Sequence, residues 1–390
     1  MVGHDLSCCL VCLRVSVGVA ETGVNQSELD ASENERCDMF DDKNNARWPT
    51  LVAGLILLIV LAAVAAMPVE LGTDECAGSA VARLTTGRRV SPTIIGQMAA
   101  AAQGTAGERL LASLAPIGET ISGAFPDDAL VSYDIGIAPD AAFELIETLI
   151  EAALPDLHTW LENVFDEFQM ATGLDPEIDL LPYLDHGLAV GLLPSEIDVD
   201  GWPFPRKVVI LRVLDDVAVS RFLEAWISWE AGAIAPKTQG VLGASVISEE
   251  VAGSKIVGLQ LDGLLPAGLP LPSPSYALAG DYLIVSSVRS AVAESLGRLE
   301  NGISPVPEAL GEETVVEVVK LNFPEWPLAW QRAEPFVGSL IDRLGGDSPT
   351  FIRFCRTMIE YLGEFQPAHG TTSLIPGGGF VFRIEVTPLR

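Results

Sequence analysis

The chain has 390 residues, of which 49% are hydrophobic and 19% charged, so it can build one large domain or two medium-sized ones around a substantial core. Its 23 basic and 53 acidic residues give a formal net charge of −30 at pH 7. Phosphate contacts need clustered Lys and Arg, so this balance excludes nucleic-acid binding as a default function. It also argues against a peripheral grip on anionic lipid.

Residues 1–47 are predicted to form an N-terminal cytoplasmic segment. Four of the six cysteines precede residue 51: Cys8, Cys9, Cys12 and Cys37. They include one C-x-x-C spacing, but no second ligand pair follows at zinc-finger distance, so the sequence predicts no metal site in this segment. Met39 begins a conventional short start, which makes an over-extended gene start the alternative interpretation of the stretch before it.

Residues 48–69 are predicted to be a transmembrane or signal segment. Leu51 to Met67 is an unbroken apolar run of about 17 residues, at the short edge of a membrane span. Lys43 and Arg47 precede the run, whereas acidic residues follow it: Glu70, Asp74 and Glu75. Because Lys and Arg are retained on the cytoplasmic side, the sequence predicts a single-pass membrane protein with its N-terminus inside and its body outside.

The same residues allow a second outcome. Small residues around Ala65-Ala66 fit the spacing of a signal-peptidase site, and cleavage there gives a secreted or periplasmic protein. The 47 residues ahead of the run are long for a signal peptide and favour a retained anchor.

Beyond the segment, residues 70–120 are rich in Ala, Gly, Thr and Ser up to about Gln103 and are predicted to be a stalk or linker. Residues 121–390 are predicted to form one extracytoplasmic domain. Its first elements are a strand over 129–137, a helix over 139–152 and a second helix that starts at Pro155-Asp156 and ends at Gly173. Strands over 188–193 and 207–213 follow, and then a helix capped by Asp215 or Asp216.

Two hairpins are predicted next. One joins 241–248 to 255–261 around Ala252-Gly253, and the other joins 276–279 to 282–286 around Gly280-Asp281. After these hairpins the predicted elements are, in chain order, a helix over 287–299, a strand over 314–321, helices over 335–344 and 350–362, and strands over 371–375 and 380–386.

The alternation of apolar and polar residues in the last strand, from Phe380 to Val386, is typical of an antiparallel sheet with one covered face. Many hairpins with interspersed helices favour an α+β fold over a doubly wound sheet. We therefore expect a mostly antiparallel sheet with helices packed on one face. A recurring order of strand, cap and helix leaves a diverged internal duplication open.

Two motifs resemble an uncharacterised bacterial family of membrane-anchored or exported proteins, known as domain of unknown function 3352. Phe125-Pro126-Asp127-Asp128-Ala129 resembles its opening signature, and Thr172 to Leu184 is similar to its Gly-x-Asp-x-x-x-Asp-x-x-Pro-x-Leu segment. The strand that ends at Ile284 to Ser287 also fits, whereas Asp185-His186 stands where a Gly-rich turn is expected. The resemblance covers roughly residues 120–390 and implies a fold and a location, with no catalytic residue to transfer.

The densest acidic cluster in the body is Asp175, Glu177, Asp179 and Asp185. Four carboxylates so close could hold a divalent cation or perform acid–base chemistry. The competing interpretation is structural, because Asp175 can cap a helix that begins at Pro176, and acidic residues favour that helix end. We favour capping.

Other polar features carry less information. The body has no H-E-x-x-H, G-x-S-x-G or phosphate-binding loop motif. Asp198 to Gly201 resembles a fragment of a calcium loop but is interpreted as a surface turn. Among the histidines, His158 is expected to be a surface or boundary residue and not a ligand, and His186, beside Asp185, is the one to test.

The aromatic and cysteine residues leave two questions open. Trp326 and Trp330 are expected in the core, with a carbohydrate or peptide groove as the alternative. Cys76 and Cys355 follow the apolar segment, where a disulfide between them could persist.

The sequence therefore assigns no catalytic, cofactor-binding or metal-ligating residue and implies no cofactor. The favoured hypothesis is an exported, membrane-anchored, non-enzymatic protein of the cell envelope. It would contact the membrane through residues 51–67 and bind or scaffold an envelope protein or small molecule, but not nucleic acid. One alternative is an extracytoplasmic hydrolase that uses the carboxylates at 175–185, and another is a carrier of lipophilic cargo.

Overall fold

A computed structural model describes the chain in nine stretches, all of which fall within one compact unit. These are residues 93–99, 113–153, 155–196, 201–237, 242–262, 272–305, 314–343, 348–374 and 379–385. The predicted apolar segment and the cytoplasmic residues before it lie outside the described residues, as does Cys76.

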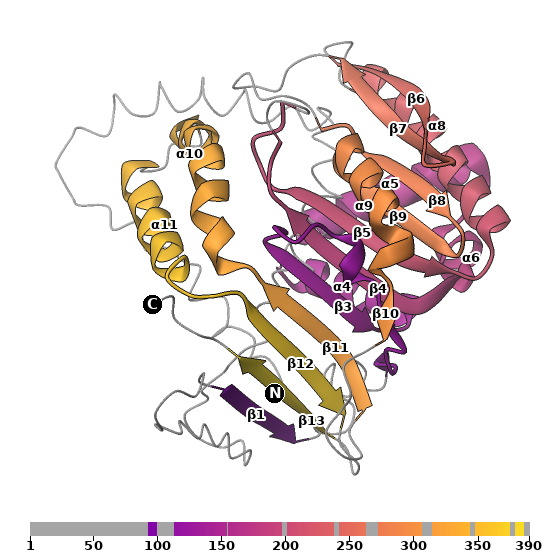
Figure 1. Ribbon diagram of the computed structural model, residues 1–390. Helices are drawn as coiled ribbons and strands as arrows, with labels where there is room; N and C mark the ends of the chain where they lie inside the picture. The colour runs from indigo at the N-terminus through magenta and orange to yellow at the C-terminus, as the bar shows by residue number, and fades with distance from the viewer. Residues whose placement is uncertain are drawn as a thin grey trace, which may run out of the picture. The chain divides into compact units, whose positions relative to one another are not determined.

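An antiparallel sheet of 11 strands forms the centre of the described body (Figure 1), in the order β1-β13-β12-β11-β3-β4-β5-β9-β8-β7-β6. Its strands in chain order are β1 (Thr93–Ala99), β3 (Val131–Gly136), β4 (Leu184–Leu193), β5 (Arg206–Val213), β6 (Gly243–Val251), β7 (Ser254–Asp262), β8 (Ser275–Ala279), β9 (Tyr282–Ser286), β11 (Thr314–Leu321), β12 (Ala368–Leu374) and β13 (Gly379–Glu385). The short strands β2 (Glu119–Thr120) and β10 (Ser304–Pro305) form a separate pair.

Helices connect these strands. The α-helices are α4 (Pro139–Ala153), α5 (Pro155–Thr172), α6 (Pro176–Asp179), α8 (Asp216–Lys237), α9 (Arg289–Gly302), α10 (Trp326–Arg343) and α11 (Ser348–Leu362). The 3-10 turns are η2 (Ser122–Ala124), η3 (Leu181–Tyr183) and η4 (Phe323–Glu325). The predicted α+β class with an antiparallel sheet is confirmed.

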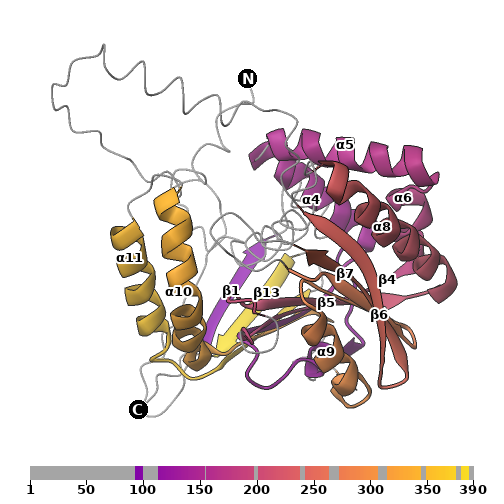
Figure 2. The same cartoon turned by 90° about the horizontal axis from the view of Figure 1, so that it is seen from above.

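Helices cover both faces of the sheet in its second half, whereas the sequence predicts cover on one face. Along β9, Leu283 belongs to the core beneath α8, and its neighbour Ile284 belongs to the core beneath α9. Figure 2 shows α4, α5, α6 and α8 on one side of the strands and α9 on the other. Successive residues of a strand point to opposite faces of the sheet. Because both Leu283 and Ile284 are apolar, both faces of β9 are buried under helices.

The two predicted hairpin turns and the predicted end of the second helix are found in the structure. The β6–β7 hairpin turns at Ala252 and Gly253, which have φ angles of 50° and 79°. The β8–β9 hairpin turns at Gly280, with φ of 54°. Helix α5 ends where Gly173 adopts φ of 73°, the left-handed conformation that closes many helices.

Two boundaries differ from the expectation. Helix α10 begins at Trp326, well before the predicted start at residue 335, and Pro335 lies inside it. Backbone N–H groups in the first turn of a helix have no acceptor within that helix. Pro327 lacks an N–H group and is therefore compatible with a helix start. Strand β1 lies within the residues expected to be a stalk, and it pairs with β13 along its whole length.

The same order of elements occurs twice. Strand β3, two helices (α4 and α5), β4 and β5 follow one another in the first half; β11, two helices (α10 and α11), β12 and β13 do so in the second. The two sets meet at the antiparallel β3–β11 pair in the middle of the sheet. The internal duplication stays a prediction, and this repeated order agrees with it.

Candidate functional site

The acidic cluster singled out in the sequence caps a helix. Asp175 Oδ1 accepts a hydrogen bond from the backbone N–H of Glu177 at 2.9 Å, and Asp179 Oδ2 accepts one from the N–H of Asp175 at the same distance. Gln169 Nε2 donates to Asp175 Oδ2 at 3.0 Å. Two of the four predicted carboxylates are therefore bound at the start of α6, as expected for caps.

Asp185 lies apart from these caps, on β4. Its Oδ1 is 3.2 Å from Nδ1 of His186, and its Oδ2 is 3.7 Å from Nε of Arg212. The hydrogen bond from the backbone N–H of His186, the His186 ring and Arg212 hold the pKa of this carboxyl below its usual value. The His186 side chain is 57% exposed, so this group is a surface ion cluster.

The remaining predicted residues also occupy structural positions. The His158 ring lies 3.6 Å from carboxylates of both Glu147 and Glu162 and is only 16% exposed. Trp326 and Trp330 lie in the first turns of α10, where Trp330 Nε1 donates to Glu334 at 2.8 Å. Asp198 and its neighbours lie outside the described residues. Cys355 carries a free thiol in this structure, and Cys76, its predicted partner, is outside the described part of the chain.

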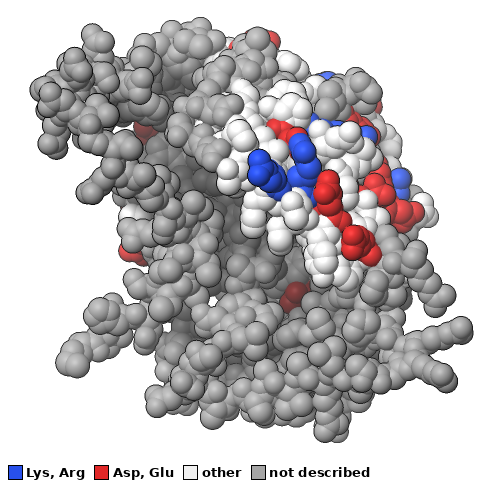
Figure 3. All heavy atoms as spheres, turned by 90° about the vertical axis from the view of Figure 1, so that its left-hand side faces the viewer, with Lys and Arg blue, Asp and Glu red and all other residues white. Residues whose placement is uncertain are grey.

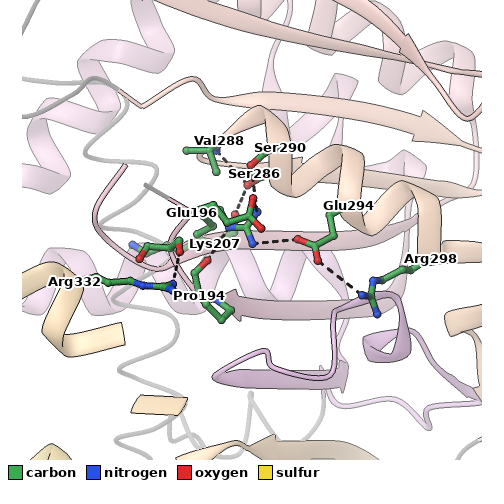
Figure 4. Close-up of polar contacts among 11 residues, drawn as sticks. Pro194, Glu196, Lys207, Ser286, Val288, Ser290, Glu294, Arg298 and Arg332 are labelled. Atoms are coloured by element: carbon green, nitrogen blue, oxygen red, sulfur yellow. Dashed lines mark hydrogen bonds and ion pairs between the residues drawn. The ribbon is translucent and has the colours of Figure 1, made fainter. Parts of the chain in front are cut away.

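Sequence reasoning missed a buried arginine that joins three parts of the body. Arg206 on β5 is 2% exposed. It donates from Nε to the carbonyl of Pro194 at 2.8 Å, and its guanidinium lies 3.1 Å from both Glu196 and Glu294. Figure 4 shows Glu294 reaching from α9, with Arg298 on its other side. The arginine therefore holds α9 and the segment after β4 to the sheet.

That segment is also bound by α10. Arg332 Nη1 donates to the Ser195 carbonyl at 2.6 Å (Figure 4), and the Phe336 ring lies 6.3 Å from the Phe204 ring. The contacts of Arg332 and Phe336 fix α10 against the first half of the body.

The residue next to Arg206 on β5 is half-buried. Burial lowers the pKa of Lys207 to about 8.

Two carboxyls inside the sheet were likewise missed. Asp134 on β3 is 2% exposed, and its Oδ1 accepts hydrogen bonds from the backbone N–H groups of Ile121 at 2.7 Å and Ser122 at 3.0 Å. Burial raises its pKa, although these bonds lower it in part. On the opposite face, burial raises the pKa of Glu317, which shares hydrogen bonds with Tyr133 and Thr372.

The most distinctive surface lies on α11. Four of its large apolar side chains are exposed to between 45% and 64%: Phe351, Phe354, Met358 and Tyr361. At about 100° per residue these four fall within an arc of roughly 80° on one side of the helix. We call them the α11 stripe. Figure 3 looks onto the side of the body where α11 lies and shows uncharged surface next to basic and acidic side chains.

Contacts to α10 explain why the stripe faces outward. A Cβ built at Gly338 of α10 would lie 2.8 Å from Cδ1 of Ile352, so α11 packs closely there through its other side. Arg356 donates to both carboxylate oxygens of Glu334. The apolar arc of α11 is therefore wider than the part that α10 covers, and the stripe is the remainder.

Pairing registers place the C-terminal end of α11 near the start of β1. Thr93 pairs with Glu385 on β13, Glu385 with His369 on β12, and His369 with Lys320 on β11. The first residue of β1 thus lies at the end of the sheet where β11 leads into α10 and α11 leads into β12. In Figure 1 both helices extend beyond this end.

Comparisons with known proteins give no match to a family model, a curated protein or a solved structure. Among the described residues, no helix combines the length and the hydropathy that crossing a membrane requires. Within the same residues, no group of three or more His, Cys, Asp or Glu side chains is placed to hold a metal ion.

Proposed function

We propose that this chain is an exported cell-envelope protein that the apolar run Leu51 to Met67 holds in the membrane, with a non-enzymatic body that binds or scaffolds an envelope component. The observation that carries the proposal is the charge asymmetry of that run. Lys43 and Arg47 precede it, and Glu70, Asp74 and Glu75 follow it.

Two features of the body support a binding role. The α11 stripe is an exposed apolar surface of the kind that marks interaction sites. The carboxylates that favoured a hydrolase, by contrast, include two that are bound as helix caps, at Asp175 and Asp179. A hydrolase needs such groups free to meet a substrate.

Labelling of intact cells with a membrane-impermeant maleimide tests the topology. The other cysteines are replaced by serine, leaving either Cys37 before the run or an introduced cysteine at exposed Ser248 on β6. The position-248 thiol is expected to react in cells whose outer barrier is opened, and Cys37 only after the inner membrane is permeabilised. Equal reactivity of both thiols would contradict the proposed orientation.

Alkaline extraction, mass measurement and a turnover assay test membrane retention, signal cleavage and activity. We expect the full chain to stay in the membrane pellet at alkaline pH, and the Leu58→Arg variant to leave it because a charge interrupts the apolar run. If the mass of the mature protein corresponds to a chain that begins after Ala65 or Ala66, the apolar run is a cleaved signal and not an anchor. Turnover of an ester, peptide or glycoside substrate that Asp175→Asn abolishes would refute the non-enzymatic part.

A further inference from the structure

We propose that the α11 stripe lies in the interface of the same membrane that holds the chain, as a second, peripheral contact beside the anchor. The inference rests on the proposed function for its tether, and on the α10–α11 hairpin for its surface. It names the lipid bilayer as the partner of this helix.

The composition of α11 fits a helix that lies flat in a bilayer interface. The stripe supplies two phenylalanines, a methionine and a tyrosine, and the polar side of the helix carries exposed Arg353 and Glu360. Helices of this kind bury their apolar face about 5–10 Å into the boundary between headgroups and acyl chains. Tyrosine suits that depth because its ring is apolar and its hydroxyl can reach water.

The local charge on α11 is close to zero, although the whole chain is strongly acidic. Between Ser348 and Leu362 the sequence holds two arginines, Arg353 and Arg356, and one acidic residue, Glu360. The rest of the chain is strongly acidic. Arg356 is ion-paired with Glu334 of α10, so Arg353 and Glu360 leave α11 close to neutral. A body that is repelled overall therefore presents an exposed apolar helix of little net charge, and this is the side that meets the least repulsion from anionic lipid.

The tether from the membrane enters the body close to the base of this helix. Residues 68–92 separate the apolar run from β1, which is 25 residues (92 − 68 + 1) with a fully extended reach of about 80 Å. Thr93 and His369 are two strands apart, or about 10 Å, and His369 follows α11 by only a few residues. The chain therefore enters the body at the base of the hairpin that carries the stripe.

A second copy of the chain is a weaker occupant. The four side chains expose roughly 400 Å² between them, about half of what each partner buries in a standard protein interface. A tethered body needs less area for a membrane contact, because the tether keeps the helix at an effective concentration on the order of millimolar. The observations therefore favour lipid over self-association.

Depth-dependent quenching in reconstituted vesicles tests the proposal. The full chain, with its native cysteines replaced by serine, receives one NBD-labelled cysteine at Phe354 in the stripe. Controls carry the label at Glu360 on the polar side of α11, or at Met170 on α5, which is 80% exposed. We expect doxyl lipids to quench NBD at position 354 at a depth of about 5–10 Å, and to quench the two controls little.

Charge is tested by one matched pair of variants. In vesicles containing anionic lipid, Arg353→Glu is expected to reduce quenching at position 354, whereas Arg221→Glu, at an exposed arginine on α8, is expected to leave it unchanged. Near-ultraviolet circular dichroism checks that each labelled variant is folded.

Three other outcomes would contradict the proposed lipid contact, and they can be told apart. If the chain resists alkaline extraction but position 354 is unquenched, the stripe does not contact lipid, and the anchor stands alone. If the chain is extracted, the anchor fails and the tethered contact fails with it. If NBD at position 354 self-quenches with rising protein density in unlabelled lipid, a second copy covers the stripe and the proposal is overturned.

Discussion

The guanidinium of Arg206 on β5 lies 3.1 Å from Oε2 of Glu294 on α9, although Arg206 is 2% exposed and the two residues are 88 positions apart. Glu294 is 26% exposed and also lies 3.9 Å from Arg298, so Arg206 is the buried member of this pair. The contact therefore decides how α9 and the segment after β4 are held to the sheet.

Arg206→Ala is expected to lower the free energy of unfolding by about 2–3 kcal/mol, because it removes the charged hydrogen bonds that the guanidinium donates to the Pro194 carbonyl and to Glu294. Urea denaturation followed by circular dichroism measures the loss. In Arg206→Met combined with Glu294→Gln the loss should be smaller, since no carboxylate remains at position 294. A double variant as unstable as Arg206→Ala would assign the effect to packing rather than to charge.

Asp134 is expected to act as a fixed acceptor for the turn at η2. Asp134→Ala leaves the buried N–H of Ile121 without its partner and should cost about 1–3 kcal/mol of unfolding free energy. Asp134→Asn keeps an acceptor oxygen and should cost less. Chemical denaturation at neutral pH compares the two; an equal loss in both would show that the negative charge, not the acceptor, is required.

Glu317 should make stability depend on pH. Burial raises its folded-state pKa above the ordinary value, so the folded protein holds this proton more tightly than the unfolded chain. The resulting stabilisation is fully present below the unfolded pKa and is lost as pH rises through the folded pKa.

We therefore expect Glu317→Gln, compared with the parent, to gain stability as pH increases from about 4 to 7. Thermal unfolding at a series of pH values measures this difference. Glu151→Gln, at an exposed position on α4, serves as the control and should show no such trend. A flat difference for Glu317→Gln would contradict the assigned burial effect.

The β6–β7 turn offers a stabilising change. Ala252 adopts φ of 50°, a left-handed conformation that costs a residue with a Cβ about 1–2 kcal/mol. Asn tolerates this conformation, and Asn-Gly is the favoured pair for such turns. Ala252→Asn is expected to raise the unfolding free energy by about 1 kcal/mol, and Ala252→Val to lower it, both by urea titration. A loss of stability in the Asn variant would show that the turn has other requirements.

Local signals predicted the elements whose boundaries depend on nearby residues. Pro155 and Gly173 delimit α5 because a proline fits a first turn and a glycine adopts the left-handed closing residue. The interpretation of Asp175 as a cap was likewise available from its place before Pro176. The start of α10 at Trp326 was not, because two prolines in the segment suggested irregular structure.

The sequence predicts the helix that carries the candidate surface, but not which of its apolar residues are exposed. A helix over 350–362 was predicted, and its apolar residues could be read from spacing. Which of them α10 covers depends on the close approach of Gly338 to Ile352, a contact between residues of two different helices. Exposure of the stripe is therefore a property of packing.

The sequence by itself determined the class of fold, the two hairpin turns and the ends of α5, and it predicts the direction of membrane insertion, because each follows from short-range chemistry or from the order of charges along the chain. Tertiary structure alone decided that Thr93 lies at the same end of the sheet as the α10–α11 hairpin, that β9 is covered on both faces, and that Arg206 meets Glu294. These contacts join residues far apart in the chain, and their energies depend on burial and strand register, which no local pattern records.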